Sequence, residues 1–251
     1  AYNNKGTFDI IIKNIEQIKI KYPEFISKIN FNAVIDLNQD VSCSNEFFMD
    51  FETVKDMNVS GNYINEGHRK EELDINPNFY VNSKYEIFKV FLYHCNRDIF
   101  DKYEPKLFDF EYTNIKQQMD DRFIGSEFDH KQKSPGGQCL PGVQRFFINV
   151  DGKFFPCERV DEELDEFCIG DIENGHDLEK AKFLLNIPQI TKEECANCWA
   201  FKLCNQCISR ANDEKEINKK NRLKNCSGVK YSIEDTMKNY IVLKEYGCNF
   251  E

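Results

Sequence analysis

A series of seven cysteines in the second half of the chain constrains the fold more than any other feature. Its members, with their spacing, are Cys139-x12-Gly152-x4-Cys157, then Cys195-x2-Cys198-x5-Cys204-x2-Cys207, and finally Cys226. Cysteines two or three residues apart can point both thiolates at one centre from a short loop, as in structural metal sites and iron–sulfur clusters. Seven thiolates exceed the four that one tetrahedral site takes and approach what two sites need. The series therefore predicts a domain built around metal ligation.

Composition limits the class of protein. The 251 residues are 41% hydrophobic and 14% aromatic, with 22 Phe, which is enough for one large or two smaller packed domains. Eleven cysteines without a secretory signal fit a reduced cytoplasm and metal ligation better than disulfides. The net charge of −10 argues against nucleic acid as a partner, and apolar runs such as Phe88–Tyr93 are too short to cross a membrane. We expect a cytoplasmic protein.

The first part of the chain has an α/β pattern. Apolar residues recur at helical spacing over Phe8–Tyr22, and Ile29–Ile35 has the pattern of a buried strand. A short helix around Asn45–Lys55 and a second strand over Met57–Ile64 follow. Helix, strand, helix and strand in alternation predict parallel α/β packing.

Residues 65–138 are predicted to be mostly helical. An apolar stripe over Tyr85–Tyr103 and a helical pattern over Asp109–Phe123 carry this prediction. The region ends at Ser134-Pro-Gly-Gly137, which breaks helical periodicity.

The cysteine-bearing part opens with a predicted β-hairpin over Arg145–Phe155. Asp151-Gly152 favours a type I′ turn, and a hairpin there would bring Cys139 and Cys157 closer together. Two helices are expected after it, over Asp177–Leu185 and over Ser232–Tyr246, the second with Ser232 as N-cap. The acidic run Asp161–Glu166 and the basic run Lys219–Lys224 are predicted to be solvated faces.

Two kinds of metal centre are compatible with the spacing. Zinc would be satisfied by a compact knuckle of Cys195, Cys198, Cys204 and Cys207, which leaves the other three cysteines unused. Two iron–sulfur clusters would use all seven, with one position open or filled by another group. Spacing alone does not separate zinc from iron, but the use of every cysteine favours clusters.

The cysteine series resembles the SPASM domain, the auxiliary-cluster module at the C-terminus of radical SAM enzymes that modify peptides and proteins. Three local segments are similar as well: Gly152-Lys-Phe-Phe-Pro-Cys-Glu158, Ile169-Gly-Asp-Ile172 and Cys198-Trp-Ala-Phe-Lys-Leu-Cys204. They look like the branch that matures cysteine-rich ribosomal peptides, often through thioether links. The resemblance covers about Cys139–Cys226, and residues 6–64 look like later βα units of the radical SAM partial barrel.

The resemblance implies an organisation and a ligand assignment. The expected parts are later βα units of a partial TIM-like barrel (1–64), a helical connection (65–138), a small irregular α+β SPASM domain with a β-hairpin (139–228) and a C-terminal helix (229–251). Cys195, Cys198, Cys204 and Cys226 would hold a distal auxiliary cluster, and Cys139, Cys157 and Cys207 a proximal one, both expected to be [4Fe-4S]. The family has three residues between the last two cysteines of the run, whereas here only Asn205 and Gln206 intervene. That difference puts the geometry of Cys207 in question.

The proximal set is one thiolate short of four. Cys168 is one candidate for the fourth ligand, and a substrate thiolate bound to an open iron is the other. The remaining cysteines (Cys43, Cys95 and Cys248) are interpreted as structural or incidental. Trp199, beside Cys198, is expected to pack over the cluster and shield it from water.

Radical SAM enzymes bind their catalytic cluster through Cys-x3-Cys-x2-Cys, and no such triplet occurs in this sequence. We therefore expect the chain to be the C-terminal portion of a longer enzyme and to be unable to cleave SAM by itself, with SAM and a third [4Fe-4S] cluster bound only in the full-length enzyme. Asn30, Asn32 and Asp36 would line the cavity near SAM, unless they only cap a strand end. No catalytic residue is identified.

The implied function is post-translational modification of a ribosomal, cysteine-rich precursor peptide, with thioether formation as the expected reaction. The implied partners are that peptide and an electron donor protein. The alternative is a zinc-stabilised module that binds a peptide or protein without catalysis.

Overall fold

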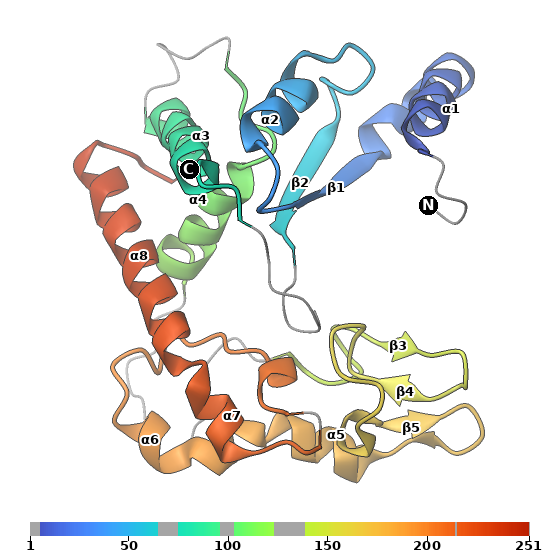
Figure 1. Ribbon diagram of the computed structural model, residues 1–251, viewed down its shortest axis with the longest axis vertical. Helices are drawn as coiled ribbons and strands as arrows, with labels where there is room; N and C mark the ends of the chain where they lie inside the picture. The colour runs from blue at the N-terminus through green and yellow to red at the C-terminus, as the bar shows by residue number, and fades with distance from the viewer. Residues whose placement is uncertain (1–5, 65–74, 96–102, 123–138, 214, 251) are drawn as a thin grey trace. The chain divides into compact units, whose positions relative to one another are not determined.

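The computed structural model describes residues 6–64, 75–95, 103–122, 139–213 and 215–250 (Figure 1). The chain divides into two compact units, one of Ala1–Asp121 with Asn239–Glu251 and one of Arg122–Lys238. Both mix helices with short strands, and helix predominates. The described strands form three two-stranded sheets, none of which closes into a barrel.

The first unit is organised around a parallel pair of strands, β1 (Asn30–Ile35) and β2 (Asn58–Tyr63). They pair in register from Asn30 opposite Asn58 to Ile35 opposite Tyr63. Parallel strands require a crossover connection, which here contains the helix α2 (Val41–Asp50). The parallel pairing expected from the alternating pattern is therefore present.

Helix α2 begins earlier than its apolar residues predict. The sequence pattern placed this helix around Asn45–Lys55, but Asp40 acts as its N-cap and accepts a hydrogen bond from the Ser42 backbone N at 3.0 Å. A capping carboxylate satisfies an otherwise unpaired N–H of the first turn, so the cap fixes the start of the helix.

Helices around the strand pair supply most of the first unit's core. The remaining elements of this unit are α1 (Phe8–Lys21), a 3-10 helix (Pro23–Lys28), α3 (Phe79–Cys95), α4 (Asp109–Ile115) and a π-helical turn (Lys116–Asp120). One buried cluster joins β1, α3, α4 and the C-terminal segment, and a smaller one lies between α1 and the residues that precede β2. Residues 96–102 of the predicted helix 85–103, and Phe123, lie outside the described residues.

The second unit opens with the predicted hairpin, but its turn differs from the expected type I′. Strands β3 (Phe147–Ile148) and β4 (Phe154–Phe155) pair antiparallel, and Gly152 N donates to Asn149 O at 3.0 Å. Gly152 has φ +76°, whereas Asp151 is not in the positive-φ region. A type I′ turn needs positive φ at both central residues, so this is a type I turn followed by a left-handed glycine.

A second short hairpin packs beside the first. It consists of β5 (Gly170–Asp171) and β6 (Gly175–His176). Ile169 N donates to Phe154 O at 2.7 Å and Ile172 N to Gly152 O at 3.0 Å. The sequence segments around Gly152 and Ile169, far apart in the chain, are thus neighbours in space.

Helices and 3-10 turns make up the rest of the second unit. They are 3-10 Asp165–Phe167, α5 (Leu178–Leu185), 3-10 Ile187–Thr191, α6 (Lys192–Ala196), 3-10 Ile208–Arg210, α7 (Lys219–Lys224) and α8 (Cys226–Glu245), which extends into the first unit. The prediction that Ser232 is the N-cap of the last helix is wrong, because α8 begins at Cys226, six residues before Ser232. No described helix combines the length and the apolar character that a membrane crossing requires.

Candidate metal centre

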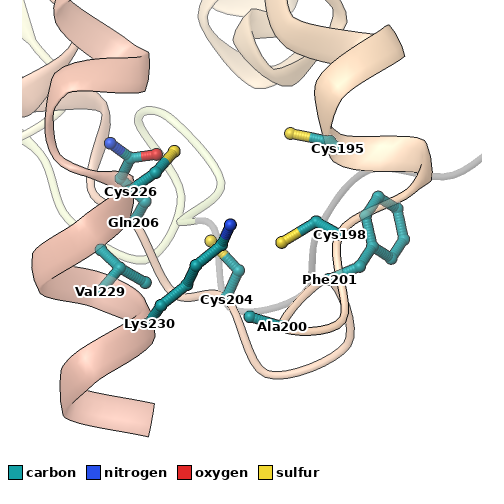
Figure 2. Close-up of a pocket in the computed structure, with 9 residues that line it drawn as sticks. All are labelled: Cys195, Cys198, Ala200, Phe201, Cys204, Gln206, Cys226, Val229 and Lys230. Atoms are coloured by element: carbon teal, nitrogen blue, oxygen red, sulfur yellow. The ribbon is translucent and has the colours of Figure 1, made fainter. Parts of the chain in front are cut away.

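Four of the seven cysteines line one pocket of the second unit. They are Cys195, Cys198, Cys204 and Cys226, the set assigned to the distal cluster. The pocket has an atom-free volume of about 350 Å³, part of it open to solvent. Figure 2 shows three of the thiols, on or just after α6, facing the helix α8 that carries the fourth.

Short local structure sets the positions of the thiols. Cys195 is in the last turn of α6, and Cys198 N donates to Cys195 O at 3.1 Å, which folds the chain back just after that helix. Cys204 follows a further turn in irregular chain, and Cys226 is the first residue of α8. A loop and a helix start, distant in sequence, therefore supply thiols to the same space.

Burial acts on the protonation of these thiols. It raises the pKa of Cys204, and it also raises the pKa of Cys226, which nearby Cys195 and Cys204 raise further. A thiol in such surroundings ionises when a cation compensates its charge, and thiolate is the form that binds metals. Lys230 lies at the same pocket, where its charge lowers the pKa of Cys226 (Figure 2).

Cys207 does not line this pocket, although it is only three residues from Cys204. Its charge acts on Cys157, whose pKa is raised mainly by burial and further by Cys207, and it acts on Arg222 as well. Ser209 Oγ donates a hydrogen bond to Cys207 Sγ at 3.2 Å. Adjacent cysteines of the run therefore belong to different surroundings.

The third member of the proposed proximal set, Cys139, is exposed. Within the described part of the chain, it does not join Cys157 and Cys207 in a group of three ligands close enough for one metal ion. Cys168 is half-buried, packs against the second unit's core, and donates from its Sγ to Gly170 O at 3.4 Å. The influence of Cys207 on the pKa of Cys157 is thus the one link among the three proximal candidates in the described residues.

Three further residues were not predicted, one in the pocket lining and two in contact with residues of that lining. Gln206, which the sequence treats as a spacer, is 6% exposed, lines the pocket, and donates from Nε2 to Arg222 O at 2.6 Å. Arg222 is 2% exposed, so the interpretation of Lys219–Lys224 as a solvated face is wrong at this position. Thr191 is fully buried, with its hydroxyl 3.3 Å from Cys195 Sγ. The position of Arg222 one helical turn before Cys226 is the signal that could have identified it.

Trp199 does not take the shielding position expected for it. Its side chain is 57% exposed, and it is not among the residues that line the pocket. Phe201, at 2% exposed, lines it instead, together with Ala200.

The candidate SAM-cavity residues lie in the first unit. Asn30 and Asn32 are exposed on β1, and Asn62 Nδ2 of β2 donates to Asn32 Oδ1 at 2.8 Å. Asp36 follows the strand, where its Oδ1 accepts from Asn38 N at 3.1 Å, which is a turn-capping role. The exposed face of β1 thus carries Asn30 and Asn32 together with one apolar residue, Val34.

The remaining cysteines lie outside the second unit. Cys43 is exposed, and Cys95 and Cys248 are in or against the first unit's core, where Cys248 Sγ is 3.5 Å from the Tyr112 hydroxyl.

The four-thiol pocket fits a multinuclear cluster. Each iron of a cluster takes one cysteine, so its ligands surround a space, and the thiols here line a pocket of this kind. Among the described residues, no three His, Cys, Asp or Glu side chains are close enough together to hold a single metal ion. Comparisons with protein-family models, with curated proteins and with solved structures find no match for this chain.

Proposed function

We propose that this chain is the auxiliary iron–sulfur portion of a radical SAM enzyme that modifies a ribosomal, cysteine-rich precursor peptide. The four cysteines of the pocket would hold the distal [4Fe-4S] cluster, and Cys157, Cys207 and Cys139 the proximal one. The reaction we favour is thioether formation on the peptide. A precursor peptide and an electron donor protein are the partners this function requires, and the compartment is the cytoplasm.

The division of the Cys195–Cys207 run carries the proposal. A zinc knuckle built from that run alone would use Cys207 as its fourth ligand. The pocket contains Cys226 instead and not Cys207, whose charge acts on Cys157. This crossed arrangement supports two centres that share one run of ligands, as in the SPASM module that the sequence resembles.

The chain's own residues would act mainly by holding and insulating the clusters. Bound clusters would supply one-electron transfer and, at an open iron of the proximal cluster, a site for a substrate thiolate. Phe201 and Ala200 limit water at the distal pocket, and Lys230 places a positive charge beside it. In the first unit, the exposed face of β1 with Asn30 and Asn32 would line the SAM cavity. SAM and the third cluster would be bound by the full-length enzyme.

Iron and sulfide analysis of the full chain, reconstituted anaerobically, tests this function. We expect a brown protein with two clusters' worth of iron and sulfide, visible absorption that dithionite bleaches, and loss of about half the iron in Cys139→Ala, because each centre has its own ligands. Cys43→Ala, which changes an exposed cysteine of the other unit, is the matched control and should keep all the iron.

A zinc-stabilised binding module gives a different outcome. The wild-type protein would then be colourless with stoichiometric zinc, and Cys139→Ala would leave the metal content unchanged. Either result would overturn the cluster assignment.

A further inference from the structure

Arg222 is a buried cation beside the four-thiol pocket. Its side chain is 2% exposed and extends from α7, one turn before Cys226. The backbone of Arg222 is held in place by its carbonyl oxygen. Arg222 O accepts from Gln206 Nε2 at 2.6 Å and lies 3.9 Å from Cys226 Sγ. Arginine stays charged under all ordinary conditions, so this position places a full positive charge inside the second unit.

Arg222 is connected to a cluster ligand through one hydroxyl group. Arg222 Nε donates to Thr191 Oγ1 at 3.2 Å, and the same oxygen lies 3.3 Å from Cys195 Sγ. The single proton of this hydroxyl can go to Pro188 O, 3.3 Å away, or to Cys195 Sγ, and a thiolate at Cys195, which can only accept, competes for it. The arginine then polarises the hydroxyl that stabilises the ligand.

The guanidinium also has a donor without a partner. Arg222 Nη1 is buried and, within the described residues, makes no hydrogen bond. An unpaired charged donor is costly to bury, so a missing acceptor is expected nearby. The charges of Cys195, Cys204, Cys226 and Cys207 all act on this guanidinium, although burial is the stronger influence and lowers its pKa.

We propose that Arg222 is a positioning residue of the distal centre, which donates from Nη1 to a thiolate or sulfide of the bound cluster and raises the cluster's reduction potential. This inference rests on the proposed function. A cluster held by four thiolates is anionic and becomes more negative when it gains one electron from a donor such as dithionite. A buried positive charge stabilises the more negative state more strongly, so it favours reduction.

The test is an anaerobic redox titration of the full chain, with the reduced cluster followed by EPR spectroscopy. Arg222→Met keeps the length of the side chain and removes its charge. We expect the variant to retain its iron and to be at least tenfold harder to reduce, which corresponds to a midpoint potential lower by 59 mV for a one-electron couple. Arg222→Lys, which keeps the charge but not the planar fork, should show a smaller decrease.

Arg210→Met is the matched control, because Arg210 is an exposed arginine of the same unit, and its potential should equal that of the wild type. An Arg222→Met protein that keeps both its iron and the wild-type potential overturns the inference and leaves the proposed function intact. If Arg222→Met does not assemble a cluster, Arg222→Lys is titrated in its place: a potential below that of the wild type supports the inference, and an unchanged potential overturns it. A wild-type chain that takes up no iron overturns the proposed function itself.

Discussion

Tyr103 lies beside the most deeply buried carboxylate of the first unit. Glu86 is 3% exposed, accepts from Asn45 Nδ2 at 2.7 Å, and pairs with Lys89 Nζ at 2.7 Å. The Tyr103 hydroxyl is buried, and Asn45 is its polar neighbour, which acts to lower its pKa. Burial, together with the charge of Glu86, raises the pKa of Tyr103 to about 12. The fold therefore favours the neutral phenol.

The raised pKa gives a stability that depends on pH. A phenol with a pKa of about 12 in the folded state and about 10 in the unfolded state stabilises the fold fully below about pH 10, and this contribution is lost as pH rises toward 12. We expect the unfolding free energy of the wild type to fall more steeply above pH 10 than that of Tyr103→Phe, measured by urea unfolding at a series of pH values. Parallel curves for the two proteins would contradict this.

The residues around the metal centre differ in how far sequence predicts them. The short spacing of the cysteines identifies Cys195, Cys198 and Cys204 as neighbours, because short intervals leave few geometries. Cys226, in place of Cys207, was expected only from the resemblance to the SPASM domain. Thr191 and Gln206 are not predictable in this way, because the sequence does not distinguish a buried polar residue from an exposed one. Arg222 could be identified only by its position one helical turn before Cys226. The burial of all three depends on α7 and on the turn before α6, which bring three separate segments together.

At the scale of elements, the strand pair of the first unit depends on one glycine. Gly61 is buried in β2, and a Cβ there would lie 2.1 Å from Leu107 O and 2.9 Å from the Phe110 ring. The backbone before α4 approaches the sheet this closely only because position 61 has no side chain. A backbone oxygen cannot move away cheaply, unlike the end of a flexible side chain.

Gly61→Ala should therefore destabilise the first unit by about 3 kcal/mol, the upper end of the usual cost of overpacking. Chemical denaturation followed by circular dichroism measures this loss. Ser60→Ala is the control, because Ser60 is the preceding residue of the same strand and is exposed, and it should change stability by less than about 0.5 kcal/mol. Equal stabilities for the two variants would show that the close approach is not part of the folded structure.

Element types were predictable here, but their ends were not. Periodicity identifies α1 and β1 closely, because each has a regular apolar pattern over its whole length. It misses the start of α2, which a capping carboxylate sets, and the start of α8 at Cys226, which precedes the apolar part of that helix. Local capping and tertiary contacts decide these positions, and neither leaves a periodic signal.

At the scale of the whole molecule, the cysteines separate by unit. The seven cysteines of the series all lie in the second unit, whereas the exposed strand face with Asn30 and Asn32 lies in the first. The main core cluster of each unit contains residues of that unit alone. The second unit has short strands and many 3-10 turns, so metal ligation is expected to contribute much of its stability.

The central claim is that Cys226, and not Cys207, completes the centre formed by Cys195, Cys198 and Cys204. The most direct measurement is EPR spectroscopy of the dithionite-reduced, anaerobically reconstituted full chain, with Cys198→Ala, Cys226→Ala and Cys207→Ala compared at equal protein concentration. We predict that Cys198→Ala and Cys226→Ala both lose the EPR signal of the distal cluster. Cys207→Ala should keep the distal signal and lose the signal of the proximal cluster. Loss of the Cys198-dependent signal in Cys207→Ala, with its retention in Cys226→Ala, would contradict the account.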